Sequence, residues 1–151
     1  MHMSTDRIEK TIVLRAPRSR VWRALARADE FGAWFGVALE GAFAPGAHVT
    51  GHITTPGHEH MPVEMMIERV EPEHLFTYRW HPYAIEPGVD YAQEAMTLVE
   101  FHLAEIADGT QLRLVESGFD RLPPERRMTA LRMNDGGWTQ QIAHIEQYVD
   151  A

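Results

Sequence analysis

Apolar and polar residues alternate along several stretches of the chain, and this alternation predicts β-strands. The first stretch is 8–15 (IEKTIVLR), where Ile8, Ile12 and Leu14 fall on one face. Asp108-Gly109, further along, is a signal for a tight hairpin turn. Strands with one apolar face predict an antiparallel sheet that is covered on one side. The later stretches with the same period are 48–54, 62–70, 75–81, 96–104 and 110–118.

Two short segments with helical spacing follow the first strand. Ala16-Pro17 interrupts the alternation, and proline is favoured in the first turn of a helix. The segment 18–26 (RSRVWRALA) then carries a short apolar stripe. The next segment, 28–36 (ADEFGAWFG), predicts a second short helix or turn that Gly36 closes.

One long amphipathic helix is predicted to begin at Pro123-Pro124-Glu125 and to run to the C-terminus. The gap between Leu131 and Trp138 contains one further position of its apolar stripe, and Asp135 occupies that position. Gly136 and Gly137 stand beside it, although each costs a helix interior roughly 0.8–1 kcal/mol relative to alanine. The stripe comprises Met128, Leu131, Trp138, Ile142, Ile145 and Val149.

Together these elements predict an α+β protein. We expect a curved antiparallel sheet of about six to seven strands wrapped around the long C-terminal helix, with two short helices after the first strand. A chain of 151 residues has the length of one domain with one core. We assign that domain to 6–151 and interpret 1–5 as a disordered N-terminus or a cloning remnant.

Composition and charge narrow the range of partners. The chain has no cysteine, which excludes disulfides and thiolate metal sites, and its net charge is −8. Such a charge disfavours nucleic acid and anionic membrane surfaces as partners. No apolar run reaches the roughly 18 residues of a membrane span, and the start has no apolar signal region. We therefore expect a cytoplasmic protein.

Five local strings together span nearly the whole chain. They are APRSRVWRAL (16–25), WFG (34–36), VEPEHLFTYRW (70–80), GTQLRLVESGF (109–119) and GGWTQQIAHIEQYV (136–149). In this order they resemble the START-like, or helix-grip, superfamily, and within it the family named after the activator of Hsp90 ATPase, in its short bacterial form. This resemblance implies a deep, mostly apolar cavity between the sheet and the C-terminal helix. Relatives in the superfamily bind lipids, sterols, plant hormones or polyketides, and some are cyclases or dehydratases.

A set of apolar and aromatic residues is predicted to line that cavity. The aromatic members suit either a packed core or a pocket for a flat ligand. Gly136 and Gly137 would leave room where the helix borders the cavity; the alternative is close packing of helix on sheet. The predicted lining comprises Trp34, Phe35, Met65, Phe76, Tyr78, Trp80, Phe101, Leu114, Glu116, Leu131, Asp135, Trp138 and Ile142.

Two carboxylates on apolar faces are candidates for chemistry. Glu116 continues the face of Leu112 and Leu114, and Asp135 lies on the helix stripe. A carboxylate in an apolar site has a raised pKa and can act as a general acid or base. Alternatively, both lie at the cavity rim, solvated or paired with an arginine (Arg79, Arg113 or Arg132).

If the protein is an enzyme, the candidate acid and base groups are Glu116, Asp135, Tyr78 and His81. The chain has no nucleophile elbow, phosphate-cradling loop or dinucleotide fingerprint, so no catalytic residue is assigned. His58 and His60 could bind a metal, but no third ligand is evident nearby, and we expect neither a metal nor a cofactor. The long connection 81–94 is apolar enough to form a lid or a dimer contact.

Three functions remain open from these residues. The first is a module that binds a small hydrophobic or aromatic molecule, lipid-like or polyketide-like. The second is a cyclase- or dehydratase-type enzyme that uses cavity carboxylates. The third is an interaction role, as a chaperone-associated protein or a homodimer. The chain has no room for the separate N-terminal domain that gives the eukaryotic Hsp90 activator most of its chaperone contact, so Hsp90 is not expected as a partner.

Overall fold

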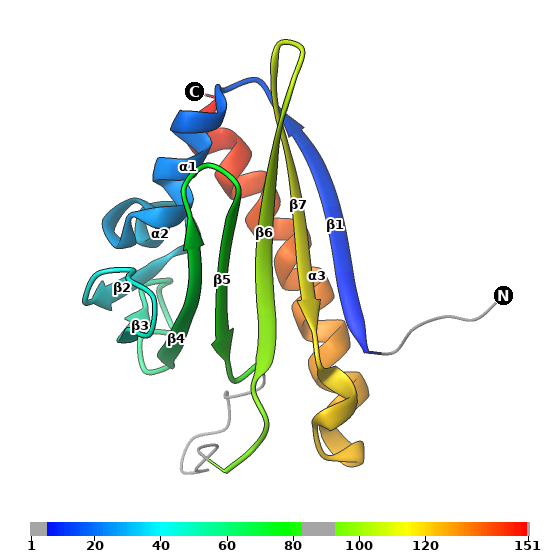
Figure 1. Ribbon diagram of the computed structural model, residues 1–151. Helices are drawn as coiled ribbons and strands as arrows, with labels where there is room; N and C mark the ends of the chain where they lie inside the picture. Colours follow the sequence, from blue (N-terminus) through cyan, green and yellow to red (C-terminus); the bar gives the residue numbers. More distant parts are fainter. Residues whose placement is uncertain (1–5, 83–92, 151) are drawn as a thin grey trace, which may run out of the picture.

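A computed structural model describes residues 6–82 and 93–150 (Figure 1). It contains seven strands, three α-helices and one short 3-10 helix in these residues. The strands are β1 (Arg7–Leu14), β2 (Val37–Glu40), β3 (His48–Ile53), β4 (Pro62–Glu71), β5 (Leu75–Trp80), β6 (Thr97–Ile106) and β7 (Gly109–Ser117). The helices are α1 (Arg18–Ala26), α2 (Ala28–Phe35), the 3-10 helix (Phe119–Arg121) and α3 (Pro124–Val149).

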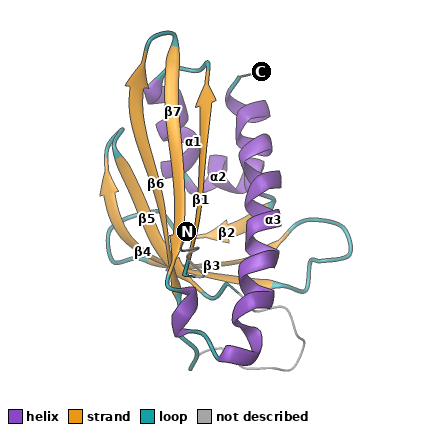
Figure 2. Ribbon diagram, turned by 90° about the vertical axis from the view of Figure 1, so that its right-hand side faces the viewer, coloured by secondary structure: helices purple, strands orange, loops and turns teal. Residues whose placement is uncertain are grey.

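The strands form one antiparallel sheet in the order β1-β7-β6-β5-β4-β3-β2. Figure 2 shows α3 running along one face of this sheet, with α1 and α2 at one end of it. The predicted α+β helix-grip fold is therefore confirmed. The strand β2 was not predicted from the sequence, because four residues are too few to show a period, and its extended form depends on pairing with β3.

The alternation in the strands predicts correctly which side chains face α3. Val99 and Phe101 of β6 are buried, as are Leu112 and Leu114 of β7. Glu116 continues this face and is fully buried. In the sheet it stands opposite Val99 on one side and Ile8 on the other.

The buried stripe of α3 agrees with the predicted one at most positions and differs from it at two. Met128 is 40% exposed, and the Asp135 side chain is 58% exposed and pairs with Lys10 at 3.1 Å. The prediction of a buried Asp135 is therefore wrong, and the half-buried residue that faces the sheet at this level is Asn134. The residues of α3 that are fully buried are Ala130, Trp138, Ile145 and Val149.

The C-terminal end of α3 is fastened to the segment between β1 and α1. The Asp150 carboxylate accepts hydrogen bonds from the backbone N–H groups of Arg15 (3.0 Å) and Ala16 (2.9 Å). These two hydrogen bonds place the last turn of α3 beside the start of α1. In the described residues, no helix is both long and apolar enough to cross a membrane.

Candidate functional site

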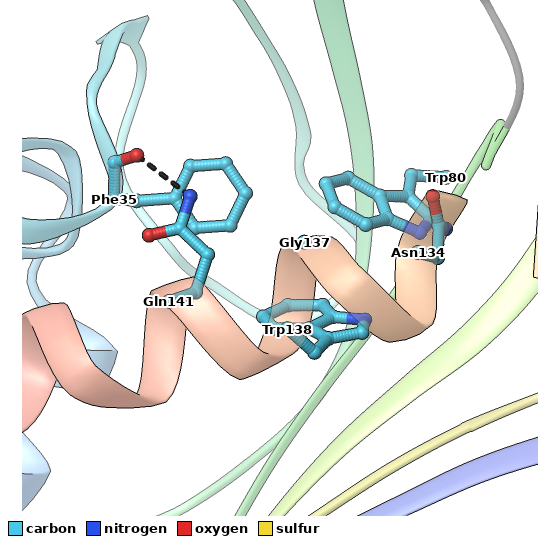
Figure 3. Close-up of a pocket in the computed structure, with 6 residues that line it drawn as sticks. All are labelled: Phe35, Trp80, Asn134, Gly137, Trp138 and Gln141. Carbon is cyan, nitrogen blue, oxygen red and sulfur yellow. Dashed lines mark hydrogen bonds between the residues drawn. The ribbon is translucent and has the colours of Figure 1, made fainter. Parts of the chain in front are cut away.

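A pocket of about 160 Å³ opens between the end of α2, the end of β5 and the middle of α3. Figure 3 shows its walls, which include the rings of Phe35, Trp80 and Trp138. The ring centroids of the three pairs lie 5.8–5.9 Å apart, so the three side chains form one continuous aromatic surface. The pocket is lined by Phe35, Trp80, Asn134, Gly137, Trp138 and Gln141.

Gly137 borders this pocket, whereas Gly136 faces solvent. A Cβ atom added to either glycine would meet no atom of another element within 4 Å. Close packing of the helix on the sheet therefore does not require the glycines. At Gly137 the missing side chain leaves space that belongs to the pocket.

Gln141 lines the pocket on the side of α2 and makes two hydrogen bonds. Its Nε2 donates to the Phe35 carbonyl oxygen at 2.9 Å, and its Oε1 lies 2.9 Å from Nδ1 of His144. The first of these contacts joins the C-terminal turn of α2 to α3. Together the two contacts occupy both polar ends of the Gln141 amide.

Glu116 lies directly behind the aromatic wall. Its Oε2 accepts hydrogen bonds from the Thr97 hydroxyl at 2.6 Å and the Trp80 indole N–H at 2.7 Å. Its Oε1 accepts from the Trp138 indole N–H at 2.8 Å. The Asn134 amide N–H₂ contacts both oxygens, at 3.0 and 3.2 Å. Three of these four donors also line the pocket, so the carboxylate organises the pocket wall without being part of it.

The N–H donors around Glu116 favour its ionised form. Indole and amide N–H groups donate and cannot accept, so these partners match a carboxylate rather than a carboxylic acid. Burial nevertheless raises the pKa of Glu116, because it removes the charged form from water. The hydrogen bonds from Thr97, Trp80, Trp138 and Asn134 act in the opposite direction.

The raised pKa of Glu116 predicts a pH dependence of stability. Since the folded protein holds this proton more tightly than the unfolded chain, stability falls as pH rises from the unfolded pKa, about 4.5, through the folded pKa. We expect the free energy of unfolding of the wild type to rise relative to that of Glu116→Gln as the pH falls from neutral into this window. Urea unfolding of both proteins between pH 7 and pH 4.5 measures this difference. A constant difference would contradict the prediction.

Several predicted lining residues are part of the packed core and lie outside the pocket. The Trp34 indole donates to the Ala24 carbonyl oxygen at 2.8 Å, which ties it to α1. Phe31 packs against the rings of Phe76, Tyr78 and Phe101 and fills the centre of the sheet's inner face. Met65 and Leu114 are buried in the same core, and Leu131 and Ile142 are half-buried against it. The predicted residues that do line the pocket are Phe35, Trp80 and Trp138.

The remaining acid–base candidates lie apart from the pocket surface. Tyr78 is buried, and its pKa is well above the ordinary value because of burial and, secondarily, the negative charge of Glu116. His81, half-buried just after β5, does not line the pocket, and neither does Asp135. Asn134 and Gln141 were missed in the sequence, since polar residues on a helix ordinarily indicate its solvated side.

The histidine pair and the long connection both lie away from the residues that line the pocket or outside the described residues. Within 6–82 and 93–150, no group of three or more histidine or acidic residues could hold a metal ion, and His58 and His60 are both exposed. The connection 81–94 was predicted to form a lid or a dimer contact, and most of it lies outside the described residues. Glu94, at its end, forms an ion pair with Arg126 of α3.

The fold recurs in proteins of known structure with low sequence identity. Protein MLL2253 from Mesorhizobium loti is 23% identical, with a TM-score of 0.75, and the alignment covers 95% of this chain and 96% of that one. The Aha1 dimer from Colwellia psychrerythraea, solved in solution, is 14% identical, with a TM-score of 0.70 and coverage of 95% and 96%.

A third similar structure is DynU16, a putative protein in the dynemicin biosynthetic locus. It is 20% identical with a TM-score of 0.71, and the alignment covers 97% of this chain and 48% of DynU16. No match to a curated protein sequence was found. At the level of sequence families, residues 15–150 match the family described as Activator of Hsp90 ATPase homolog 1-like protein. The chain therefore belongs to this family, as its N-terminal, central and C-terminal strings had indicated.

Proposed function

We propose that this protein binds one small molecule, about the size of one aromatic ring, in the pocket between α2, β5 and α3. The observation that carries the proposal is the aromatic wall of Phe35, Trp80 and Trp138 around the space left by Gly137. Ligand sites are typically concave and apolar, with a few placed polar groups. This pocket has that composition, with Asn134 and Gln141 as its polar members.

The volume limits the size of the ligand. Pockets for drug-sized ligands occupy roughly 300–1,000 Å³, whereas a cavity of about 150 Å³ accepts benzene. The pocket here, at about 160 Å³, fits one ring or a compact pair of rings. This favours a compact molecule of about this size over the lipid-like or polyketide-like ligand that the family resemblance implied. A small-molecule role is also consistent with the place of DynU16, a protein of this fold, in the dynemicin biosynthetic locus.

The position of Glu116 favours binding over acid–base catalysis. A general base must lie within hydrogen-bond reach of the proton that it removes. Both carboxylate oxygens of Glu116 are already engaged by donors from β5, β6 and α3. A substrate in the pocket would meet these donors before it met the carboxylate.

We expect indole and phenol to bind saturably at one site, whereas pyrene, which has four fused rings, should not bind there. Two of the pocket walls are tryptophans, so a titration followed by tryptophan fluorescence and by the NMR signals of the indole N–H groups measures this directly. Loss of the size preference, or no saturable change with any of the three probes, would overturn the proposal.

Self-association is a separate proposal, supported by the dimeric Aha1 structure from Colwellia psychrerythraea. Native mass spectrometry of tag-free protein at several concentrations tests it. A dimer that persists on dilution would support it, and a monomer throughout would exclude it. The same spectra would show any small molecule that is retained during purification.

A further inference from the structure

The charge of the pocket surroundings distinguishes between classes of small ligand. All six lining residues are uncharged, so no side chain of the pocket offers a positive charge to an anionic ligand. The carboxylate of Glu116 lies directly behind the wall, hydrogen-bonded to two of its rings, and is fully buried. The field of a buried charge is only weakly screened by solvent, and here it is negative.

Two pocket walls are joined to this carboxylate through hydrogen bonds. The indole N–H groups of Trp80 and Trp138 donate to opposite oxygens of Glu116, at 2.7 and 2.8 Å. Such a bond draws the proton towards the acceptor and leaves more electron density on the ring, because hydrogen-bonded groups polarise one another. An indole face already attracts cations, and it does so better than a phenyl or phenol face. These bonds should therefore make both indole faces more attractive to positive charge.

The amide of Asn134 adds a hydrogen-bond acceptor to the pocket. Its nitrogen faces the Glu116 carboxylate, which can only accept, and this fixes the orientation of the amide. The Asn134 carbonyl oxygen is therefore directed away from Glu116. The other amide of the lining, that of Gln141, is occupied by the Phe35 carbonyl oxygen and by His144. The polar atom available to a ligand is thus an acceptor.

We propose that the pocket binds a compact organic cation, with a trimethylammonium group or a similar alkylammonium group seated against Phe35, Trp80 and Trp138. Quaternary ammonium groups are recognised by aromatic cages of this kind. The rings are inclined to one another, with interplanar angles of 67° and 69° between Phe35 and the two indoles. They therefore form the sides of a concave surface. The inference rests on the proposed function of the same pocket and specifies its ligand.

A matched pair of ligands tests the charge preference. Choline and 3,3-dimethyl-1-butanol have the same shape, but only choline is charged. We expect choline to bind saturably and about 10-fold more tightly than its neutral isostere, measured by tryptophan fluorescence at constant ionic strength with KCl as the reference salt. Equal binding of the pair, or tighter binding of the alcohol, would overturn the inference.

The outcomes separate this inference from the proposed function. If indole and the neutral isostere bind but choline does not, the preference for cations is wrong and the pocket remains a binding site. If none of these compounds binds, the proposed function fails, and this inference fails with it. Saturable choline binding that exceeds that of the isostere supports both.

Two variants test whether the preference for a cation depends on the carboxylate of Glu116. Glu116→Gln should reduce the choline-to-isostere affinity ratio by about 3-fold or more, whereas Glu100→Gln should leave the ratio unchanged. Glu100 lies on β6 near His102, on the opposite face of the sheet from Val99 and Phe101. If Glu116→Gln does not fold, Gly137→Leu provides the second test, because it fills the pocket and should abolish choline binding. An unchanged ratio in folded Glu116→Gln, or full choline binding by Gly137→Leu, would contradict the assignment.

Discussion

Replacing Glu116 with leucine is expected to lower the free energy of unfolding by roughly 2–6 kcal/mol. Leucine has a similar size but accepts no hydrogen bond, so the donors around it lose their common partner. The Thr97 hydroxyl and the Trp138 indole N–H are in buried residues, and each buried unsatisfied donor costs about 1–3 kcal/mol. Since small domains are stable by only about 5–15 kcal/mol, this loss is large.

The matched control is Asp135→Leu, which removes the other carboxylate that the sequence places on an apolar stripe. Asp135 is exposed, and its pairing with Lys10 belongs to a class worth about 0–1 kcal/mol. We expect this variant to differ from the wild type by no more than about 1 kcal/mol. Urea unfolding, followed by circular dichroism, compares the two. A loss below 1 kcal/mol for Glu116→Leu would show that the hydrogen-bond network contributes little to stability.

The second large effect is expected for ligand binding. Gly137→Leu places a side chain in the pocket, where the structure shows open space around the position of a Cβ atom. A leucine side chain would occupy most of a volume of about 160 Å³. We expect at least about a 50-fold loss of indole affinity, since displacing a seated ring removes burial worth roughly 2–3 kcal/mol.

Gly136→Leu is the matched control for this experiment, because the two glycines are adjacent in the same helix and only one borders the pocket. Both substitutions remove a glycine from a helix interior, which should raise stability by up to about 1 kcal/mol. Gly136 faces solvent, so its substitution should leave indole affinity within about 2-fold of the wild type. If the two variants lost affinity equally, the pocket would not be the binding site.

Much of the sheet could be predicted from the sequence because its strands have a strict period of two. That period correctly places Glu116 on the inner face with Leu112 and Leu114. The partners of Glu116 could not be predicted in this way. They come from three elements, and their side chains meet only when those elements pack together.

The N-terminal half of α3 is the clearest failure of prediction, and it has a physical reason. The helix has a half-buried polar side chain, Asn134, in the middle of its stripe, and this side chain donates to Glu116. A stripe drawn through apolar residues alone places Met128 and Asp135 inside, whereas both are exposed. A buried hydrogen-bonding partner on another element is invisible to periodicity.

The aromatic residues show a second limit of the sequence. Phe76, Tyr78 and Trp80 share one face of β5, so alternation treats them alike. Phe76 and Tyr78 lie within the core, while Trp80, the last residue of the strand, reaches the pocket. Trp80 lines the pocket because it lies near the end of α2, and the alternation along β5 contains no information about where α2 lies.

The pairing of β1 with β7 has a consequence for the order in which the protein folds during synthesis. Arg7 pairs with Ser117, 110 residues further along the chain, whereas β4 with β5 and β6 with β7 are joined by short turns. On the ribosome, β1 emerges first and has no strand to join until β7 has followed. Non-local pairings of this kind form slowly, in milliseconds to seconds. The two local hairpins can therefore form early, and β1, which precedes the other six strands of the sheet in the chain, is among the last to take its place.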